Sequence, residues 1–201
     1  VTRKLEENAN ADLQYLQNIC KTAIAWLELN IKEGGVKIIA FGQGLFKPGM
    51  KILTHCHSST VEKLLISANL KGPFHVFNTE TRPLFQGRIT ARNLSASKVH
   101  TTMVADAAST FLISSASGKD LIMDLIILGA DAVLPDGSAI NKLGSYGISL
   151  AAKNENVPLY VACNLLKMDN DGIIPIEIRK SEEIWANKPK GLKILNFAFD
   201  K

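Results

Sequence analysis

Short apolar runs alternate with segments of helical pattern along most of this chain, and that alternation is the strongest constraint on its fold. Apolar runs of strand length occupy residues 50–55, 74–78, 100–105, 124–129 and 159–162, with weaker strand patterns at 36–41 and 192–197. Helical patterns occupy residues 60–70, 87–97, 107–117 and 141–154. Continuous apolar strands separated by helices of about 10–15 residues are typical of a parallel sheet covered on both faces. We therefore expect an α/β fold, a Rossmann-like parallel sheet with helices on both faces.

A long helical segment precedes this alternating region. In residues 4–33 apolar side chains recur at three-, four- and five-residue steps with Glu and Lys between them, and Gly34-Gly35 is expected to end the helix. Its apolar stripe must pack against another surface, either a segment outside this sequence or another subunit. We expect residues 1–35 to be the end of a truncated N-terminal helical domain, and residues 36–201 to form the Rossmann-like domain.

Composition restricts the class of protein. Of the 201 residues, 46% are hydrophobic and the net charge is only +4, which argues against a disordered chain. The longest apolar stretch, residues 122–130, contains Asp124 and is far shorter than the roughly 20 residues of a membrane-spanning helix. Residues 1–10 are polar and charged, unlike the apolar core of a signal peptide. We expect no membrane association.

The cysteines and the basic residues restrict the compartment and the partners. The three cysteines are widely spaced, and no pair has the CxxC spacing of a zinc site, so we expect reduced thiols in a cytoplasmic protein. A basic balance suits an anionic partner. Lys and Arg are scattered, however, and aromatic residues make up only 6% of the chain, so no direct nucleic-acid partner is expected.

Polar residues follow each expected strand, at the edge of the sheet where a ligand would bind. In an open parallel sheet, ligands lie beyond the carboxyl ends of the strands. The residues at these ends are Cys56, His57, Ser58, Ser59, Glu80, Thr81, Arg82, Asp106, Asp131 and Asn164. Any one of them has a plainer explanation, since loops are polar and Ser58 or Asp106 could cap the following helix. The whole row is better explained by a ligand site.

Cys56 and Asp131 are the residues in this row best suited to chemistry. A thiol at the start of a helix has its thiolate favoured by backbone N–H groups, so Cys56 could be a nucleophile, a general acid or a packing residue. Three consecutive ligands in the His-Cys-His run are poor chelate geometry, and no metal site is expected. Asp131 follows an apolar strand, where partial desolvation would raise its pKa and suit acid/base work. A loop-capping role for Asp131 is the alternative.

Asn141 and Lys142 open the helix expected at 141–154. A Lys at a helix start is disfavoured by the helix dipole, so its presence there indicates a bound anion such as a phosphate, with sugar hydroxyls as further partners. Gly42-Gln-Gly44 lacks the third glycine of a dinucleotide fingerprint, and there is no Walker motif. We therefore expect no NAD or ATP cofactor, and a small anionic ligand beside Cys56 and Asp131.

Several of these strings also resemble one superfamily, in order and at plausible spacing from about residue 45 to 185. The matching strings are Ile52–Ser58, Thr79–Pro83 with Gln86-Gly87, Gly129–Asp131 and Gly137–Gly144. The superfamily includes methylthioribose-1-phosphate isomerase, ribose-1,5-bisphosphate isomerase and the regulatory alpha, beta and delta subunits of translation initiation factor 2B. The Thr-His-Cys-His-Ser string is most similar to ribose-1,5-bisphosphate isomerase.

The resemblance implies a set of roles for these residues. It implies that Cys56 and Asp131 are the acid/base pair of an aldose–ketose isomerase, which needs no cofactor. It implies that Gln86, Asn141 and Lys142 hold the sugar and its phosphate. Arg82 and Ser58 lie in the same strings, and we expect both to contact the substrate as well.

The reaction that this resemblance implies is conversion of ribose-1,5-bisphosphate to ribulose-1,5-bisphosphate. Family members generally form homodimers or larger homo-oligomers, and we expect the same here. One alternative is a non-catalytic regulatory subunit, similar to those of initiation factor 2B, that binds a sugar phosphate or nucleotide; another is methylthioribose-1-phosphate isomerase. Two features depart from the family pattern: an N-terminal Arg-Gly phosphate motif is not found, and Asn164–Met168 matches neither enzyme.

Overall fold

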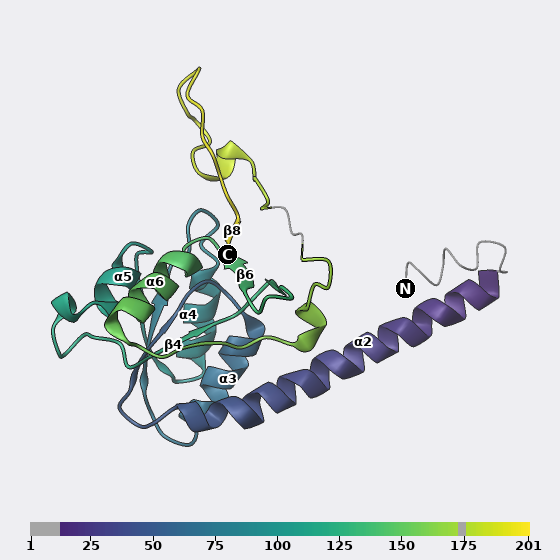
Figure 1. Cartoon of the computed structure of the whole chain (residues 1–201), viewed down its shortest axis with the longest axis horizontal. Helices are drawn as coiled ribbons and strands as arrows, with labels where there is room; N and C mark the ends of the chain where they lie inside the picture. Colours follow the sequence, from purple (N-terminus) through teal and green to yellow (C-terminus); the bar gives the residue numbers. More distant parts are fainter. Residues whose placement is uncertain (1–12, 173–175) are drawn as a thin grey trace.

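A parallel five-stranded sheet is the centre of the molecule (Figure 1). The computed structural model describes residues 13–172 and 176–201. The strands are β1 (Lys51–Thr54), β2 (His75–Thr79), β3 (His100–Val104), β4 (Leu125–Leu128) and β7 (Leu159–Val161), in the order β3-β2-β1-β4-β7. The helices between them are α3 (Ser59–Asn69), α4 (Gly87–Ala96), α5 (Ala108–Ile113) and α6 (Ser145–Glu155). The expected α/β fold with a parallel sheet is confirmed.

Each face of the sheet has its own core, because successive side chains of a strand point to opposite faces. In β1, Ile52 packs on one face and Leu53 on the other, and both are fully buried. The first core adds Val61, Leu64 and Leu65 of α3 and Leu94 of α4. The second adds Leu112 and Ile113 of α5 and Ile148 and Ala152 of α6. Each fully buried side chain of this kind contributes about 1.5–3 kcal/mol, so the two cores stabilise the packing of helices on both faces of the sheet.

The strand order reverses at β1, and this reversal positions the site. From β1 the chain builds outward through β2 to β3, then returns to place β4 on the other side of β1. Ile52 of β1 is in register with Val76 of β2 and with Leu125 of β4. Helices leave such a reversal point in opposite directions, so a crevice opens beyond the carboxyl ends of β1 and β4.

The N-terminal helix is longer than the sequence pattern predicts. α2 runs continuously over Leu13–Gly42, so the expected end at Gly34-Gly35 and the expected strand at 36–41 are wrong. A Cβ on Gly34 would lie 2.0 Å from Nδ2 of Asn164, whose amide donates a hydrogen bond to the Asn30 carbonyl at 3.1 Å. Gly34 therefore serves close approach of a loop to the helix, rather than helix termination. Residues 4–12 of the expected helix lie outside the described residues.

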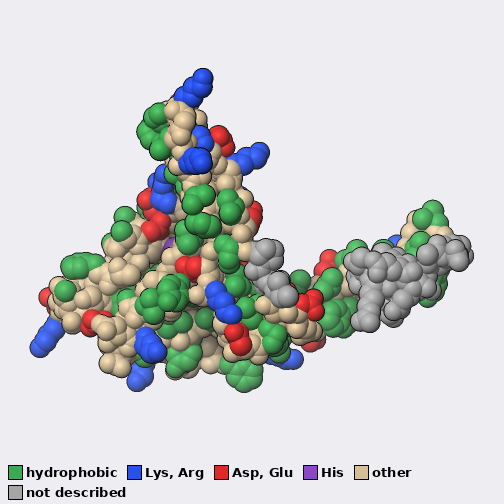
Figure 2. All heavy atoms as spheres, turned by 45° about the horizontal axis from the view of Figure 1, so that its top comes forward, with side chains coloured by type: hydrophobic (Ala, Val, Ile, Leu, Met, Phe, Trp, Pro, Cys, Tyr) green, Lys and Arg blue, Asp and Glu red, His purple; other side chains and the backbone are tan. Residues whose placement is uncertain are grey.

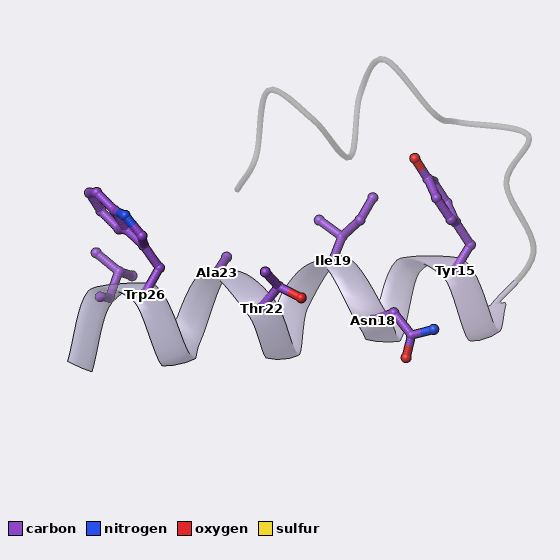
Figure 3. Close-up of a pocket in the computed structure, with 7 residues that line it drawn as sticks. Tyr15, Asn18, Ile19, Thr22, Ala23 and Trp26 are labelled. Atoms are coloured by element: carbon purple, nitrogen blue, oxygen red, sulfur yellow. The ribbon is translucent and has the colours of Figure 1, made fainter. Parts of the chain in front are cut away.

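α2 projects from the α/β body and contains no buried residue (Figure 1). Ile38 and Ile39 in its last turns pack against the first core. Further toward the N-terminus, Tyr15, Ile19, Ala23 and Trp26 point to the same side of the helix (Figure 3), beside a hollow of about 550 Å³. Apolar side chains along this helix are visible at the surface in Figure 2. The boundary expected after residue 35 falls inside this continuous helix, and the division into two domains remains a prediction.

A small antiparallel sheet lies beside the main one and corrects two further predictions. It consists of β5 (Ala132–Val133), β6 (Ala139–Lys142) and β8 (Phe199–Asp200), in the order β5-β6-β8. Asn141 and Lys142 are thus strand residues, not the start of a helix; Gly144, with a φ of +110°, separates them from α6. The strand expected at 192–197 is also wrong, since that segment contributes only an isolated bridge between Ile178 and Phe197.

We predict that Ala substitution at the two adjacent glycines of α2 has opposite effects on stability. Gly35→Ala meets no atom within 4 Å and should raise the free energy of unfolding by about 0.5–1 kcal/mol through helix propensity. Gly34→Ala displaces the Asn164 amide and its hydrogen bonds, and should be less stable than Gly35→Ala by about 1–2 kcal/mol. Urea unfolding of both variants measures the difference, and equal stabilisation by both would contradict this account of Gly34.

Candidate functional site

A cavity of about 580 Å³ opens at the crevice beyond β1 and β4. It receives residues from the β1–α3 loop, from the end of β4, from β6, from the segment after β7 and from α2. The polar lining residues are Cys56, His57, Ser58, Ser59, Thr60, Gln86, Asp131, Asn141, Lys142, Asn164, Lys167 and Arg179. The fold therefore brings together loops that are more than a hundred residues apart in the sequence.

The predicted catalytic and substrate-contact residues all line this cavity except Arg82, whereas Glu80, Thr81 and Asp106 from the row at the strand ends do not line it. Arg82 instead lines a separate cavity of about 210 Å³, and its guanidinium donates a hydrogen bond to the Ile184 carbonyl at 3.3 Å. Its backbone N–H is bound by the Asp106 carboxylate at 2.7 Å, as is that of Thr81. Both hydrogen bonds of Arg82 thus stabilise the loops around it. Its expected contact with a ligand stays a prediction.

The Cys56 thiol is buried at the floor of the cavity. The residue is 7% exposed, and its Sγ lies 3.7 Å from Oε1 of Gln86. Burial raises the pKa of this thiol, with a smaller contribution from the Asp131 charge, and these effects outweigh the lowering by the His57 backbone N–H and by Lys142. The expectation that the loop favours the thiolate is therefore wrong in its net direction. A protonated thiol can act as a general acid, which is one of the roles that the sequence left open.

Asp131 lies at the rim of the same cavity. Its backbone N–H donates to the Ile140 carbonyl at 2.8 Å, which fixes the residue beside β6. Its side chain is exposed, so the expected partial desolvation is not found in this chain. The cavity thus combines a buried thiol at its floor with an exposed carboxylate at its rim.

Ser58 and Gln86 help to build the floor. Ser58 is the N-cap of α3, where its hydroxyl accepts the backbone N–H of Val61 at 3.4 Å, as the capping alternative expected. Its Oγ would lie 2.8 Å from a Cβ at position 129, so the ends of β1 and β4 are in close contact there. Gln86 is the residue immediately before α4. Both side chains also face the cavity, so capping and ligand contact are compatible roles.

Lys142 is the most deeply buried cation of the cavity. The residue is 7% exposed, and its Nζ lies 4.7 Å from the centre of the Phe199 ring. No carboxylate forms an ion pair with it among residues 13–172 and 176–201. The neighbouring Asn141 amide donates to the Ser145 hydroxyl at 2.8 Å, which fixes the turn into α6. A buried ammonium without an anionic partner favours binding of an anion.

Two further cations line the cavity that the sequence did not indicate. The Lys167 ammonium donates a hydrogen bond to the Ala130 carbonyl, next to Asp131. Arg179 forms an ion pair with Glu183 at 3.2 Å. Lys167 lies in the segment 164–168, which matches neither enzyme pattern, and Arg179 lies in the irregular segment that precedes β8. Neither position could be identified as a ligand contact from the sequence alone. Lys142 and Lys167 form no ion pair among the described residues, so they give the cavity an excess of positive charge over the one lining carboxylate, Asp131. The charge of Arg179, in contrast, is compensated by Glu183 and Glu177.

The sequence matches a known protein family over nearly its whole length. Residues 2–201 match the model of a family described as "Initiation factor 2 subunit family". The chain belongs to this family. Within the family, a ribose 1,5-bisphosphate isomerase of Methanocaldococcus jannaschii is 32% identical over 207 residues, covering 100% of this chain and 59% of the relative. A methylthioribose-1-phosphate isomerase of Geobacter sp. (strain M21) is 31% identical over 213 residues, covering 96% of this chain and 60% of the relative.

A solved structure of this family has the same fold. The translation initiation factor eIF-2B of Pyrococcus horikoshii OT3 superposes with a TM-score of 0.73 and 28% identity, covering 86% of this chain and 60% of that one. The family resemblance read from the sequence is thereby confirmed. The chain spans about 60% of the length of each of these relatives.

The described residues contain neither a grouping of metal-binding side chains nor a helix suited to cross a membrane. Between residues 13 and 172 and from 176 onward, no three His, Cys, Asp or Glu side chains are grouped in a way that could hold a metal ion. Over the same residues, the helices lack the combination of length and hydropathy that crossing a membrane requires.

We predict that this protein loses stability as the pH falls below about 6.5, in part because of His55. His55 is 3% exposed, and burial lowers its pKa. The unfolded chain therefore binds a proton that the folded chain does not, so stability is present above the unfolded pKa and is lost as the pH falls through the folded one. Urea unfolding at about pH 7.5 and 5.5 measures the change.

His55→Gln provides the comparison for this pH effect. Its free energy of unfolding should be lower at pH 7.5 but should fall less on acidification, because the titrating group is gone. Burial also lowers the pKa of His75, and the charges of His100 and Lys51 lower it further. Because His75 is present in both proteins, it does not affect the difference in pH dependence between them. An equally steep fall in both proteins would contradict the assignment to His55.

Proposed function

We propose that this protein is an aldose–ketose isomerase that converts ribose-1,5-bisphosphate to ribulose-1,5-bisphosphate. The observation that carries the proposal is the pairing, in one cavity, of the buried Cys56 thiol with the exposed Asp131 carboxylate. The positive charge of Lys142 and Lys167 around them suits a substrate with more than one phosphate.

The chemistry of the reaction explains why it needs this pair. The bond between C1 and the ring oxygen must break, the hydrogen on C2 must move to C1, and the C2 hydroxyl must become a carbonyl. The electron pair of the broken bond goes to the ring oxygen, which takes a proton from an acid, while a base accepts the proton from C2. The resulting enol is then protonated at C1 as the C2 hydroxyl loses its proton. The atoms and electrons balance without an oxidant, a reductant or a cofactor.

The two side chains suit different halves of this exchange. The raised pKa of Cys56 keeps its proton available for the leaving ring oxygen. Asp131, exposed at the rim, is suited to accept a proton. Lys142 and Asn141 line the same cavity, where they could hold a phosphate and a hydroxyl while the ring opens.

One observation favours a second substrate, methylthioribose-1-phosphate. Leu27, Ile31 and Ile38 of α2 form an apolar wall of the same cavity. Such a wall suits a methylthio group better than a second phosphate. The relative from Geobacter, which is named for that activity, is consistent with this candidate.

A non-catalytic subunit is the third candidate, and turnover separates it from the isomerases. The structural relative from Pyrococcus is named as a translation initiation factor. Binding of a sugar phosphate would raise the thermal stability of an enzyme and of a regulatory subunit alike, whereas only an enzyme would form a ketose product. The expected homo-oligomer and the cytoplasmic location also remain predictions; light scattering after gel filtration tests the former.

We predict that Cys56→Ser and Asp131→Asn each reduce ribulose-1,5-bisphosphate formation by about 100-fold or more, since acid/base groups contribute about 10²–10⁴-fold. Product formation by the purified chain is followed by mass spectrometry or NMR. Cys20→Ser, on α2, and Asp120→Asn, beside the amino end of β1, are matched controls outside the cavity and should retain turnover. Full turnover in either site variant would remove this mechanism, and ligand-induced stabilisation without turnover in the natural chain would favour the non-catalytic candidate.

We predict that ribose-1,5-bisphosphate binds at least about tenfold more tightly than methylthioribose-1-phosphate, because hydrogen bonds to charged groups contribute about 1.5–3 kcal/mol each. Thermal-shift titrations with both ligands give the two dissociation constants. Lys167→Met should weaken binding of the bisphosphate more than binding of the monophosphate. Tighter binding of methylthioribose-1-phosphate would replace the first candidate with the second.

A further inference from the structure

Cys56 has a backbone conformation that is rare for a residue with a side chain. Its φ is +67°, in the left-handed region where Cβ crowds the backbone. Residues persist in this region only when surrounding groups hold them there. The main sheet does not provide that restraint, because β1 ends at Thr54. The restraint must come from side chains beyond the sheet.

Two threonine hydroxyls hold the Cys56 backbone from both sides. The Cys56 N–H donates to Oγ1 of Thr81 at 3.0 Å, and Oγ1 of Thr90 donates to the Cys56 carbonyl at 3.1 Å. The two threonines are 1% and 2% exposed, so water does not compete for these hydrogen bonds. Thr90 belongs to α4, whereas Thr81 lies in the loop after β2.

From Thr81 the hydrogen bonds continue through the interior to His55 and to the Leu143 carbonyl. Oγ1 of Thr81 lies 3.2 Å from Oγ1 of Thr79, which lies 2.6 Å from Nδ1 of His55. Nε2 of His55 lies 3.0 Å from the carbonyl of Leu143, the residue after Lys142. A buried chain of polar groups therefore joins the loop of the thiol to the turn that follows the buried ammonium.

The chemistry of its two ends fixes the direction of every hydrogen in this chain. The Leu143 carbonyl only accepts, so Nε2 of His55 carries a hydrogen, and burial keeps the ring neutral by lowering its pKa. Nδ1 must then accept from the Thr79 hydroxyl, which leaves Thr79 to accept from Thr81. Thr81 is thereby free to accept the Cys56 N–H. Each group has one compatible role, so the chain acts as a unit.

We propose that Thr81, Thr79 and His55 are positioning residues that act together on the Cys56 thiol. They hold Cys56 in its left-handed conformation, which keeps the thiol buried beside Gln86. They also hold the thiol loop and the turn after Lys142 in one fixed relation. The chemical role of the thiol rests on the proposed function, but the placement of the thiol does not.

The pH dependence of Cys56 alkylation tests this proposal without any substrate. The purified 201-residue chain is treated with iodoacetamide over a range of pH, and peptide mass spectrometry gives a separate rate for each cysteine. Thr81→Val keeps the shape of the side chain but removes the hydroxyl. Cys56 should then relax and become more exposed, so that its thiol titrates at lower pH and reacts about tenfold faster near pH 8, as expected for a one-unit shift.

Two comparisons separate positioning from general loosening of the structure. Thr81→Ser retains the hydroxyl and should restore the natural profile at Cys56. Cys163, half-buried outside the candidate cavity, serves as an internal reference and should react at its natural rate in every variant. An unchanged Cys56 profile in Thr81→Val, or equal acceleration at Cys163, would overturn the proposal. If Thr81→Val does not fold, Thr79→Val interrupts the same chain of hydrogen bonds. It should accelerate Cys56 alkylation to the same extent, and an unchanged profile would again overturn the proposal.

A double substitution tests whether the chain acts as a unit. His55→Leu removes both ring nitrogens and should accelerate Cys56 alkylation about as much as Thr81→Val does. The double variant should show about the same tenfold effect as either single variant, because both interrupt one chain. Independent effects would multiply to about a hundredfold and would contradict the shared role. Because no sugar is present, absence of isomerase turnover would leave this result intact, and an unchanged profile in an active enzyme would overturn only the positioning role.

Discussion

The pairing of β1 with β2 on one side and with β4 on the other is the constraint on which the rest of the structure depends. It places the carboxyl ends of β1 and β4 next to each other, although Thr54 and Leu128 are far apart in the chain. α3 follows β1 and the β5–β6 hairpin follows β4, and residues of both connecting loops line the cavity. The candidate site is the space between them. The strand order therefore decides which polar residues meet in the site, because these residues are far apart in the sequence.

The main sheet could be predicted because its strands carry their own signal. Apolar runs such as Leu125–Leu128 are buried on both faces, and burial on both faces requires apolar residues at every position. The short strands of the second sheet carry no such signal. β6 pairs locally with the two-residue strand β5, and its last residues, Asn141 and Lys142, pair with Asp200 and Phe199, nearly sixty residues later; such long-range pairing leaves little trace in the local pattern. The same reason explains why the expected strand at 192–197 was misplaced.

The candidate site was predicted in outline and missed in its electrostatics. Reading the residues after each strand located Cys56, Ser58 and Asp131, because the carboxyl ends of parallel strands share one edge. That rule does not give burial. Cys56 is more buried than a residue at a loop start suggests, and Asp131 is more exposed, so the pKa expectation for the thiol was reversed. Lys167 and Arg179 enter the cavity from segments whose path cannot be deduced from spacing.

The turn at Gly144 links two positions that are almost ninety residues apart in sequence. Its φ of +110° is open to few residues other than glycine, and a Cβ there would lie 3.3 Å from Nε2 of His55. The bare backbone lets the Leu143 carbonyl approach the imidazole. A side chain at position 144 would be strained by the backbone even if the residue at 55 were smaller. Among natural variants of this chain, position 144 should therefore remain glycine, and the packing of His55 against bare backbone should persist with it.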